Sequence, residues 1–447
     1  MTCVIIGIIF YNTIFFLYAT MRTTFMILAL VAAIAAAEKY AMVFGTKDGW
    51  GNYSIASEPC RVYSDLILAG IKPENILLMT YDSQLNSDRN PFKGMIFTEP
   101  ADNTDRDWAK YGCFEHMDYT GKDINPAVFL AILSGDAAKV TELTGKENPK
   151  VLAATEEDTV FTYFIDHGND GIIAVGDGVV KDNELVGSIQ IAHEKKLYGK
   201  WLFYMEACHS GSMFKWMPEG LDIYVMTSSD ADHNAKMSSC PPDDYIEDKH
   251  FGCCLSGLWD NSWTSYLEAN PKTTVGDLFD AVKEDVAKTS EQNICQFGDM
   301  KFRDMKVADF FGELPARRFR APKATKGTQV PLDQVPLHLA KWNAIRADKY
   351  EAKKAMAEYE KLAFEAAKRE VEVMRLGAAL MNEKAADKAL KTSATAYSAS
   401  CLTELSQSLH EKCGHPNPLS YSTMNMLRNI CQPGLTMPNV DWSAICM

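Results

Sequence analysis

Two short stretches of the chain end in side chains that could do chemistry together. Residues 161–165 and 201–205 are hydrophobic, aromatic and β-branched runs, typical of buried strands. The first is followed by His167 and the second by Cys208. Because catalytic groups gather at the carboxyl ends of parallel strands, neighbouring strands would bring this imidazole and this thiol to one crevice. A base beside a thiol nucleophile is the arrangement of a cysteine hydrolase.

The surroundings of this pair favour catalysis over a structural role. The alternatives are a buried cysteine that behaves as a small hydrophobe and a histidine that merely closes a strand. Small residues after Cys208, up to Gly211, would let a substrate backbone approach closely. His167 would take the proton of the thiol and deliver it to the leaving amine. The backbone N–H groups of Gly168 and Cys208 are candidates for an oxyanion hole.

The elements that must position these residues alternate along the first two thirds of the chain. Hydrophobic runs and helical patterns follow one another from about residue 38 to residue 311. The expected strands are Tyr40–Gly45, Ile76–Tyr81, Val160–Ile165, Trp201–Met205 and Ile223–Thr227, and the helical stretches include Glu58–Ala69 and Asp182–Leu197. This alternation predicts an α/β domain over residues 38–313, with a mainly parallel sheet flanked by helices.

The last third of the chain differs in character. Residues 314–335 are rich in proline and predict an exposed linker that is open to proteolysis; its basic residues are Arg317, Arg318, Arg320, Lys323 and Lys326. A long helical pattern then runs from Leu337 to Ala386. Residues 336–447 are expected to form an all-α domain stapled by two disulfides, for which three pairings are open; the four cysteines are Cys401, Cys413, Cys431 and Cys446.

The amino terminus and the composition indicate a secretory protein. Residues 1–37 carry two apolar runs separated by Met21 and Arg22, and the second run has the parts of a cleaved signal peptide, with Met21 as a possible start. The competing interpretation is a signal anchor, but both runs are short for a membrane span. Twelve cysteines fit the secretory route. The formal charge of −14 argues against nucleic acid or an anionic membrane as partner.

A group of acidic, histidine and cysteine residues between positions 230 and 254 has side chains that suit zinc. Its members are Asp230, Asp232, His233, Cys240, Asp243, Asp244, Asp248, His250, Cys253 and Cys254. Their spacing matches no compact ligand motif, and cysteines of secretory proteins more often form disulfides. We therefore expect a disulfide-braced acidic loop beside the substrate, with no metal or other cofactor. Cys60, Cys113 and Cys295 are expected to be core or disulfide residues.

Taken together, these motifs resemble the legumain (asparaginyl endopeptidase) family, which belongs to the caspase-like clan of cysteine peptidases. The residues that carry the resemblance are Asp166-His167-Gly168 and Glu206-Ala207-Cys208-x-Ser210-Gly211-Ser212. Supporting segments begin at Gly49, Asp118, Pro126 and Val335, and the cysteine-rich tail resembles the carboxy-terminal prodomain of that family. The resemblance covers residues 40–447 and implies a caspase-like α/β sheet.

The resemblance also assigns site residues. The catalytic asparagine of the family, which orients the histidine, corresponds to Asn52, and the acidic residue of its asparagine pocket corresponds to Glu206. Two other pocket positions differ, because Ser54 replaces an arginine and Gly257 replaces an acidic residue. A pocket that reads a carboxamide needs paired donors and acceptors, and their loss is costly. We therefore expect a preference at the P1 residue, the one before the cut bond, that differs from strict asparagine.

The family resemblance implies a cysteine endopeptidase made as a zymogen and located in the lysosome, the vacuole or outside the cell. Its partners would be peptide substrates, its own prodomain as an intramolecular inhibitor, and cystatin-like inhibitors. Three alternatives stay open: a peptide ligase or transpeptidase on the same site, a transamidase that acts on membrane-anchored substrates, and a catalytically weak binding homologue. A transamidase would share the histidine and cysteine but would normally lack the cysteine-rich tail.

Overall fold

The computed structural model describes residues 37–315, 327–390, 394, 397–415, 421–433 and 440–447. The predicted signal peptide, apart from its last residue, lies outside the described residues. The same holds for the basic residues predicted in the linker: Arg317, Arg318, Arg320, Lys323 and Lys326. Within the described ranges, no helix is both long enough and apolar enough to cross a bilayer.

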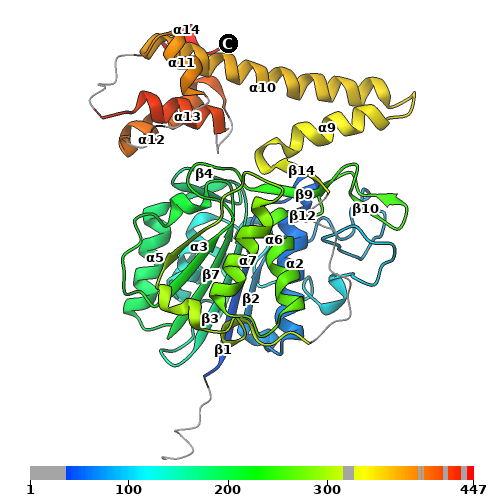
Figure 1. Cartoon of the computed structure of the whole chain (residues 1–447), viewed down its shortest axis with the longest axis vertical. Coiled ribbons are helices and arrows are strands. Elements are labelled where there is room, and N and C mark those ends of the chain that lie inside the picture. Colours follow the sequence, from blue (N-terminus) through cyan, green and yellow to red (C-terminus); the bar gives the residue numbers. More distant parts are fainter. Residues whose placement is uncertain (1–36, 316–326, 391–393, 395–396, 416–420, 434–439) are drawn as a thin grey trace, which may run out of the picture. The chain divides into compact units, whose positions relative to one another are not determined.

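A six-stranded sheet forms the centre of the α/β region (Figure 1). Its strand order is β13-β8-β7-β3-β1-β2, and every pair is parallel except the edge pair of β13 and β8. The strands are β1 (Lys39–Gly45), β2 (Ile76–Met79), β3 (Thr159–Ile165), β7 (Lys200–Glu206), β8 (Ile223–Thr227) and β13 (Cys295–Gly298). The prediction of a mainly parallel sheet is confirmed, and the expected strands lie within two residues of the observed ones.

Helices cover both faces of this sheet, as the alternating pattern predicted (Figure 1). One face packs against α2 (Tyr53–Leu68), α6 (Leu258–Ala269) and α7 (Val275–Ala287), and the other packs against α3 (Pro126–Leu133) and α5 (Asp182–Glu194). Successive strand residues alternate between the two cores: Val43 faces α2, whereas Phe44 contacts Phe129 of α3. Helix α2 begins five residues before the predicted start, directly after Asn52.

A three-stranded sheet of order β12-β9-β14 lies at the carboxyl edge of the domain. Its strands are β9 (Lys236–Cys240), β12 (Ser256–Gly257) and β14 (Thr328–Pro331). The end of the linker is therefore not exposed, in contrast to the sequence-based expectation. Backbone pairing with β9 and burial of Leu332 and Val335, each 2% exposed, hold it against the domain.

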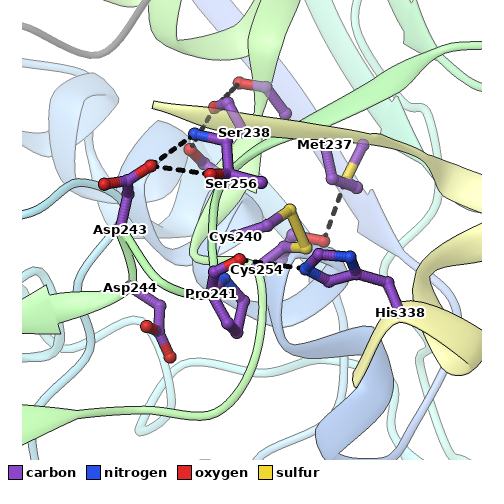
Figure 2. Close-up of a disulfide and its surroundings, with 12 residues drawn as sticks. Met237, Ser238, Cys240, Pro241, Asp243, Asp244, Cys254, Ser256 and His338 are labelled. Atoms are coloured by element: carbon purple, nitrogen blue, oxygen red, sulfur yellow. Dashed lines mark hydrogen bonds between the residues drawn. A yellow bond between two sulfur atoms is a disulfide. The ribbon is translucent and has the colours of Figure 1, made fainter. Parts of the chain in front are cut away.

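A disulfide between Cys240 and Cys254 closes the loop that joins β9 to β12 (Figure 2). This confirms the expectation of a disulfide-braced acidic loop in this region, and Cys253 remains a free, buried thiol. The loop also holds the linker, because Asp243 accepts hydrogen bonds from the backbone and hydroxyl of Thr328 at 2.7 and 2.8 Å. Elsewhere, Cys60 pairs with Cys113, and Cys295 is free.

The carboxy-terminal region is helical and contains two disulfides, as predicted. Its helices are α9 (Val335–Arg346), α10 (Ala352–Leu380), α11 (Glu383–Ala389), α12 (Ala399–Cys413), α13 (Tyr421–Ile430) and α14 (Trp442–Ile445). Of the three open pairings, the one formed is Cys401–Cys431 with Cys413–Cys446. The prediction of one helix from Leu337 to Ala386 is wrong. Asp348 accepts hydrogen bonds from two backbone N–H groups of a turn, and Asn382 caps a new helix by accepting from Ala385.

Candidate active site

His167 and Cys208 follow the carboxyl ends of two adjacent parallel strands. Ile165 of β3 lies opposite Glu206 of β7, so the two loops leave the sheet side by side. The loops are in contact: a Cβ atom placed on Gly168 would lie 2.4 Å from the carbonyl oxygen of Cys208. Only glycine therefore fits at position 168, where the two loops pack backbone against backbone.

Asn52 contacts the imidazole of His167. Its Oδ1 atom lies 2.9 Å from Nε2 of His167, and its Nδ2 donates to the carbonyl oxygen of Asp48 at 2.7 Å. Because the amide nitrogen is committed to Asp48, the oxygen faces the ring and accepts from Nε2–H. The remaining nitrogen, Nδ1, is then left as the basic one. Asn52 occupies the 3₁₀ turn directly before α2, which fixes its position against the sheet.

Burial keeps both members of the pair neutral in this closed state. It lowers the pKa of His167 to about 4, with a further contribution from the charge of Lys47. Burial also raises the pKa of the Cys208 thiol well above its usual value, and the carboxylates of Asp333 and Glu206 raise it further. Cys208 is only 2% exposed. A thiolate–imidazolium pair is thus disfavoured while both groups are buried.

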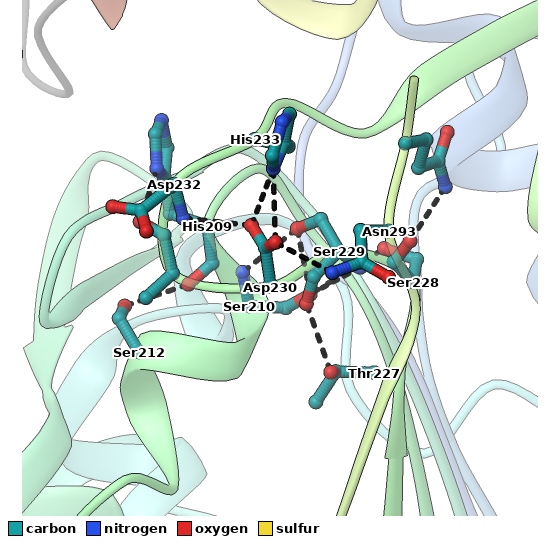
Figure 3. A network of polar contacts seen from close by, with 12 residues as sticks. His209, Ser210, Ser212, Thr227, Ser228, Ser229, Asp230, Asp232, His233 and Asn293 are labelled. Carbon is teal, nitrogen blue, oxygen red and sulfur yellow. Dashed lines mark hydrogen bonds and ion pairs between the residues drawn. The ribbon is translucent and has the colours of Figure 1, made fainter. Parts of the chain in front are cut away.

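A polar network holds the loop that follows Cys208 (Figure 3). His209 adopts a left-handed conformation with φ of 56°, and its backbone N–H donates to the carbonyl of His233 at 3.0 Å. Ser210 and Ser229 exchange hydrogen bonds of 3.1 Å in both directions between backbone and side chain. These bonds tie the loop after β7 to the loop after β8, so the thiol sits on a rigid support.

Residues that raised the question of a metal are engaged with one another in the same region. Asp230 accepts from His233 Nδ1 at 2.8 Å and from Asn293 at 2.9 Å (Figure 3). Asp244 accepts from His250 Nδ1 at 2.7 Å. Cys240 and Cys254 are consumed by their disulfide. Their contacts hold the loop after β8 and the loop between β9 and β12.

The end of the linker lies against the nucleophile. After β14, the backbone N–H of Leu332 donates to the carbonyl of Ala235 at 3.0 Å. The next residue, Asp333, is close enough for its carboxylate to raise the pKa of Cys208 and for its backbone to hydrogen-bond the thiol. Its side chain accepts from Asn234 at 3.1 Å. The linker thus pairs with β9 as the extended strand β14, and a short 3₁₀ helix (Leu332–Gln334) then brings Asp333 to Cys208. Pairing with the edge of a strand is a common way for extended peptides to bind.

The predicted specificity residues lie beside a cluster of buried carboxyl groups. Ser54 is buried and its hydroxyl lies 3.1 Å from the sulfur of Met237. Gly257 donates its backbone N–H to the carboxylate of Glu58. A Cβ atom at Gly257 would lie 2.7 Å from Asp260 Oδ2 and 3.3 Å from Glu206 Oε1. The structure thus adds Glu58 and Asp260 to Glu206. The sequence signal that could have indicated Glu58 and Asp260 is an acidic residue among the apolar residues of a buried helix.

The helical carboxy-terminal region contacts the loop after His167. Arg428 of α13 forms ion pairs with Asp170 and Asp232, both at 2.9 Å. Tyr397 donates its hydroxyl to Asp170, and Lys215 lies 3.4 Å from the same carboxylate. Sequence reasoning missed Arg428, although an arginine among the apolar residues of a short helix is a recognisable signal.

Comparisons with known proteins show the family to which the chain belongs. Residues 39–313 match the model of the peptidase C13 family. Mouse (Mus musculus) legumain is 32% identical over 313 residues, which cover 69% of this chain and 68% of that protein. Vacuolar-processing enzyme beta-isozyme 1 of Oryza sativa subsp. japonica is 30% identical over 286 residues, which cover 62% of this chain and 56% of that protein. Among solved structures, caspase-1 of Spodoptera frugiperda aligns over 63% of this chain and 92% of its own, with 12% identity and a TM-score of 0.35. On the family match and the legumain similarity, the chain belongs to the peptidase C13 family and is a legumain-family cysteine endopeptidase.

Proposed function

We propose that the protein is a zymogen whose catalytic residues are Cys208, His167 and Asn52. The observation that carries this proposal is the 2.9 Å contact between His167 and Asn52, on a loop packed against the backbone of Cys208. In the reaction, Nδ1 of His167 takes the thiol proton and the sulfur attacks the scissile carbonyl carbon. The backbone N–H groups of Gly168 and Cys208 stabilise the oxyanion. The imidazolium then protonates the leaving amine, and water hydrolyses the acyl-enzyme.

Latency follows from what covers the site. Strand β14 and the 3₁₀ helix after it occupy the edge of β9 that a substrate would use, and Arg428 fastens the helical region to Asp170. Both contacts support an intramolecular inhibitor, which acid would loosen and which cleavage between about residues 314 and 343 would release for good. The proposed inhibitor is residues 336–447 together with the end of the linker.

The proposed location is an acidic compartment of the secretory pathway, the lysosome or vacuole, or the extracellular space. Four disulfides join described residues, and such bonds form in oxidising compartments. Peptides are the proposed substrates, and cystatin-like proteins are proposed inhibitors. We also propose that the P1 preference differs from strict asparagine, because Ser54 offers a single hydroxyl where a carboxamide pocket needs several donors.

Cleavage of a quenched peptide library after acid incubation tests this function. The wild-type protein should gain activity on acidification, and Cys208→Ala should reduce kcat/KM by about 10³-fold or more, the scale of losing a catalytic nucleophile. Cys295→Ala is the matched control, since Cys295 is the partly exposed free cysteine of β13 and should leave activity unchanged. Equal activity of wild type and Cys208→Ala would contradict the proposed function.

A further inference from the structure

Three carboxyl groups from three elements meet beneath the nucleophile. Glu58 comes from α2, Glu206 from the end of β7, and Asp260 from the first turn of α6. All three are at most 3% exposed. Burial raises the pKa of Glu58 and of Glu206 well above the ordinary carboxyl value, and the neighbouring Asp260 raises each further. The empty cluster therefore resists ionisation, and a cation placed against it would stabilise the ionised carboxylates.

Some carboxyl oxygens of the cluster lack a hydrogen-bond donor among the described residues. Among the described residues, neither oxygen of Glu206 and not Oδ2 of Asp260 has a hydrogen-bond partner of normal geometry. The other oxygens are occupied: Glu58 accepts from Tyr163 at 2.8 Å, and Asp260 Oδ1 accepts from Trp263 at 3.0 Å. Buried acceptors of this kind are costly unless a ligand or proton satisfies them.

The unsatisfied oxygens lie next to the reacting sulfur. Glu206 is two residues before Cys208, and its charge is close enough to raise the pKa of the thiol. Gly257, whose missing side chain faces Glu206 and Asp260, pairs with Met237 of β9, the strand along which the linker runs to Cys208. The backbone of Gly257 thus separates β9 from these carboxyl groups by a single residue without a side chain.

Basic side chains near the cluster are committed elsewhere. Arg61 lies one turn after Glu58 on α2, but it is directed to Glu268 at 3.2 Å and Asp65 at 3.7 Å. Position 54, one turn before Glu58, holds a serine. A neutral carboxamide at this place would find acceptors in excess and few donors, whereas an ammonium or guanidinium group supplies donors alone.

We infer that this site takes the cationic side chain of lysine or arginine at the residue whose carbonyl Cys208 attacks. The inference rests on the proposed function and specifies its substrate class. The inference also explains why the linker can lie at the thiol of Cys208 without being held in the specificity site. Asp333, the linker residue at the thiol, carries the charge that the cluster repels, and its carboxylate is bound by Asn234. The linker therefore covers the thiol without filling the specificity site.

Peptides that differ only at P1 test the inference on the acid-activated full-length protein. We expect kcat/KM for P1 lysine or arginine to exceed that for asparagine and aspartate by about 10-fold or more. Glu206→Gln should lower kcat/KM for the basic substrates by about 10- to 100-fold, the scale of losing a hydrogen bond to a charged group, and should lower it less for P1 asparagine. Asp260→Asn should act in the same direction. Glu284→Gln, the same change at an exposed position of α7, should leave the P1 profile unaltered.

The outcomes separate the inference from the function beneath it. Efficient cleavage after asparagine or aspartate, with weak cleavage after lysine and arginine, would overturn the inference and leave the peptidase function intact. An equal loss for every P1 residue in Glu206→Gln would also overturn it, because it would reveal a purely structural role. If no peptide is cleaved, both the inference about P1 and the proposed peptidase function are contradicted. The wild-type profile alone decides the matter if the variants fail to fold.

Discussion

Arg428 of helix α13 and Asp170, three residues after His167, form a buried ion pair in which Nη2 and Oδ1 lie 2.9 Å apart. Neither side chain is more than 2% exposed. The same guanidinium reaches Asp232 and the carbonyl oxygen of Ala231, each at 2.9 Å. One residue of the helical region thus contacts the loop that follows the predicted base and the loop after β8, to which the loop of Cys208 is hydrogen-bonded.

Replacing Arg428 should weaken closure strongly. Removing one partner of a buried pair leaves an uncompensated charge and typically costs about 3–5 kcal/mol. Arg428→Ala should therefore become active at a higher pH than wild type, as measured by peptide cleavage after incubation across a pH series. Arg375→Ala, an exposed arginine of α10, is the control. An unchanged activation profile in Arg428→Ala would mean that this contact does not keep the enzyme latent.

As the pH falls, protonation of His209 should weaken the closed state at a higher pH than protonation of Asp170 does. Burial raises the pKa of Asp170, but Arg428 and Lys215 lower it more, so its net pKa lies below 3.8. The stability that this carboxylate contributes is present above its ordinary pKa and is lost only in stronger acid. Burial lowers the pKa of His209 from 6.5 to about 4. A histidine that is neutral when closed and charged when exposed loses stability for the closed state as the pH falls from 6.5 towards 4.

His209→Asn should therefore shift acid activation to lower pH. Asparagine tolerates the left-handed backbone at this position and can keep a side-chain donor towards Ala231, to which His209 Nδ1 now lies at 2.8 Å. The largest possible effect is on the order of 3 kcal/mol from one titrating group. Activation midpoints of this variant and of His193→Asn, at a partly exposed histidine of α5, provide the comparison. A midpoint at or above that of wild type would contradict the role of His209.

The hydrogen bond from His167 to Asn52 predicts a loss in turnover more than in binding. Asn52→Ala leaves the imidazole free to rotate and to adopt the wrong tautomer, so kcat should fall by about 10- to 100-fold while KM changes little. Steady-state kinetics on the activated protein measure both constants. Asn75→Ala, on the surface turn before β2, is the control. A rise in KM with constant kcat would indicate that Asn52 binds substrate instead.

The sequence predicted the reacting pair because its signals are local. Each strand is a hydrophobic run, and parallel neighbours put His167 and Cys208 at one edge. The covering parts could not be predicted in this way. Strand β14 is a short polar segment with a proline, and only pairing with β9 makes it a strand. The pair of Arg428 and Asp170 joins residues more than 250 positions apart, so no local pattern indicates it.

The proposed specificity site could not be predicted in full from the sequence for the same reason. Alignment by motif placed an acidic residue at position 257, where the chain has glycine. Only the structure reveals that Asp260, one helical turn later, directs its carboxylate to the place that a side chain at 257 would occupy. Relative to the position that the resemblance implies, the carboxylate is displaced from residue 257 to Asp260 of α6, which a comparison position by position cannot detect.

This displacement yields a prediction about coupling between two positions. The backbone of Gly257 has φ of −79°, which any residue adopts, so glycine is required there by space alone. Gly257→Ala should cost about 1–3 kcal/mol in the free energy of unfolding, since its Cβ would press on the carboxylate of Asp260. Asp260→Ala removes that carboxylate, so Gly257→Ala should cost little in its background. A double-mutant cycle by urea unfolding should therefore give a favourable coupling of about 1 kcal/mol or more. Strictly additive effects would mean that the two positions do not compete for the same space, and that Asp260 does not replace the charge missing at Gly257.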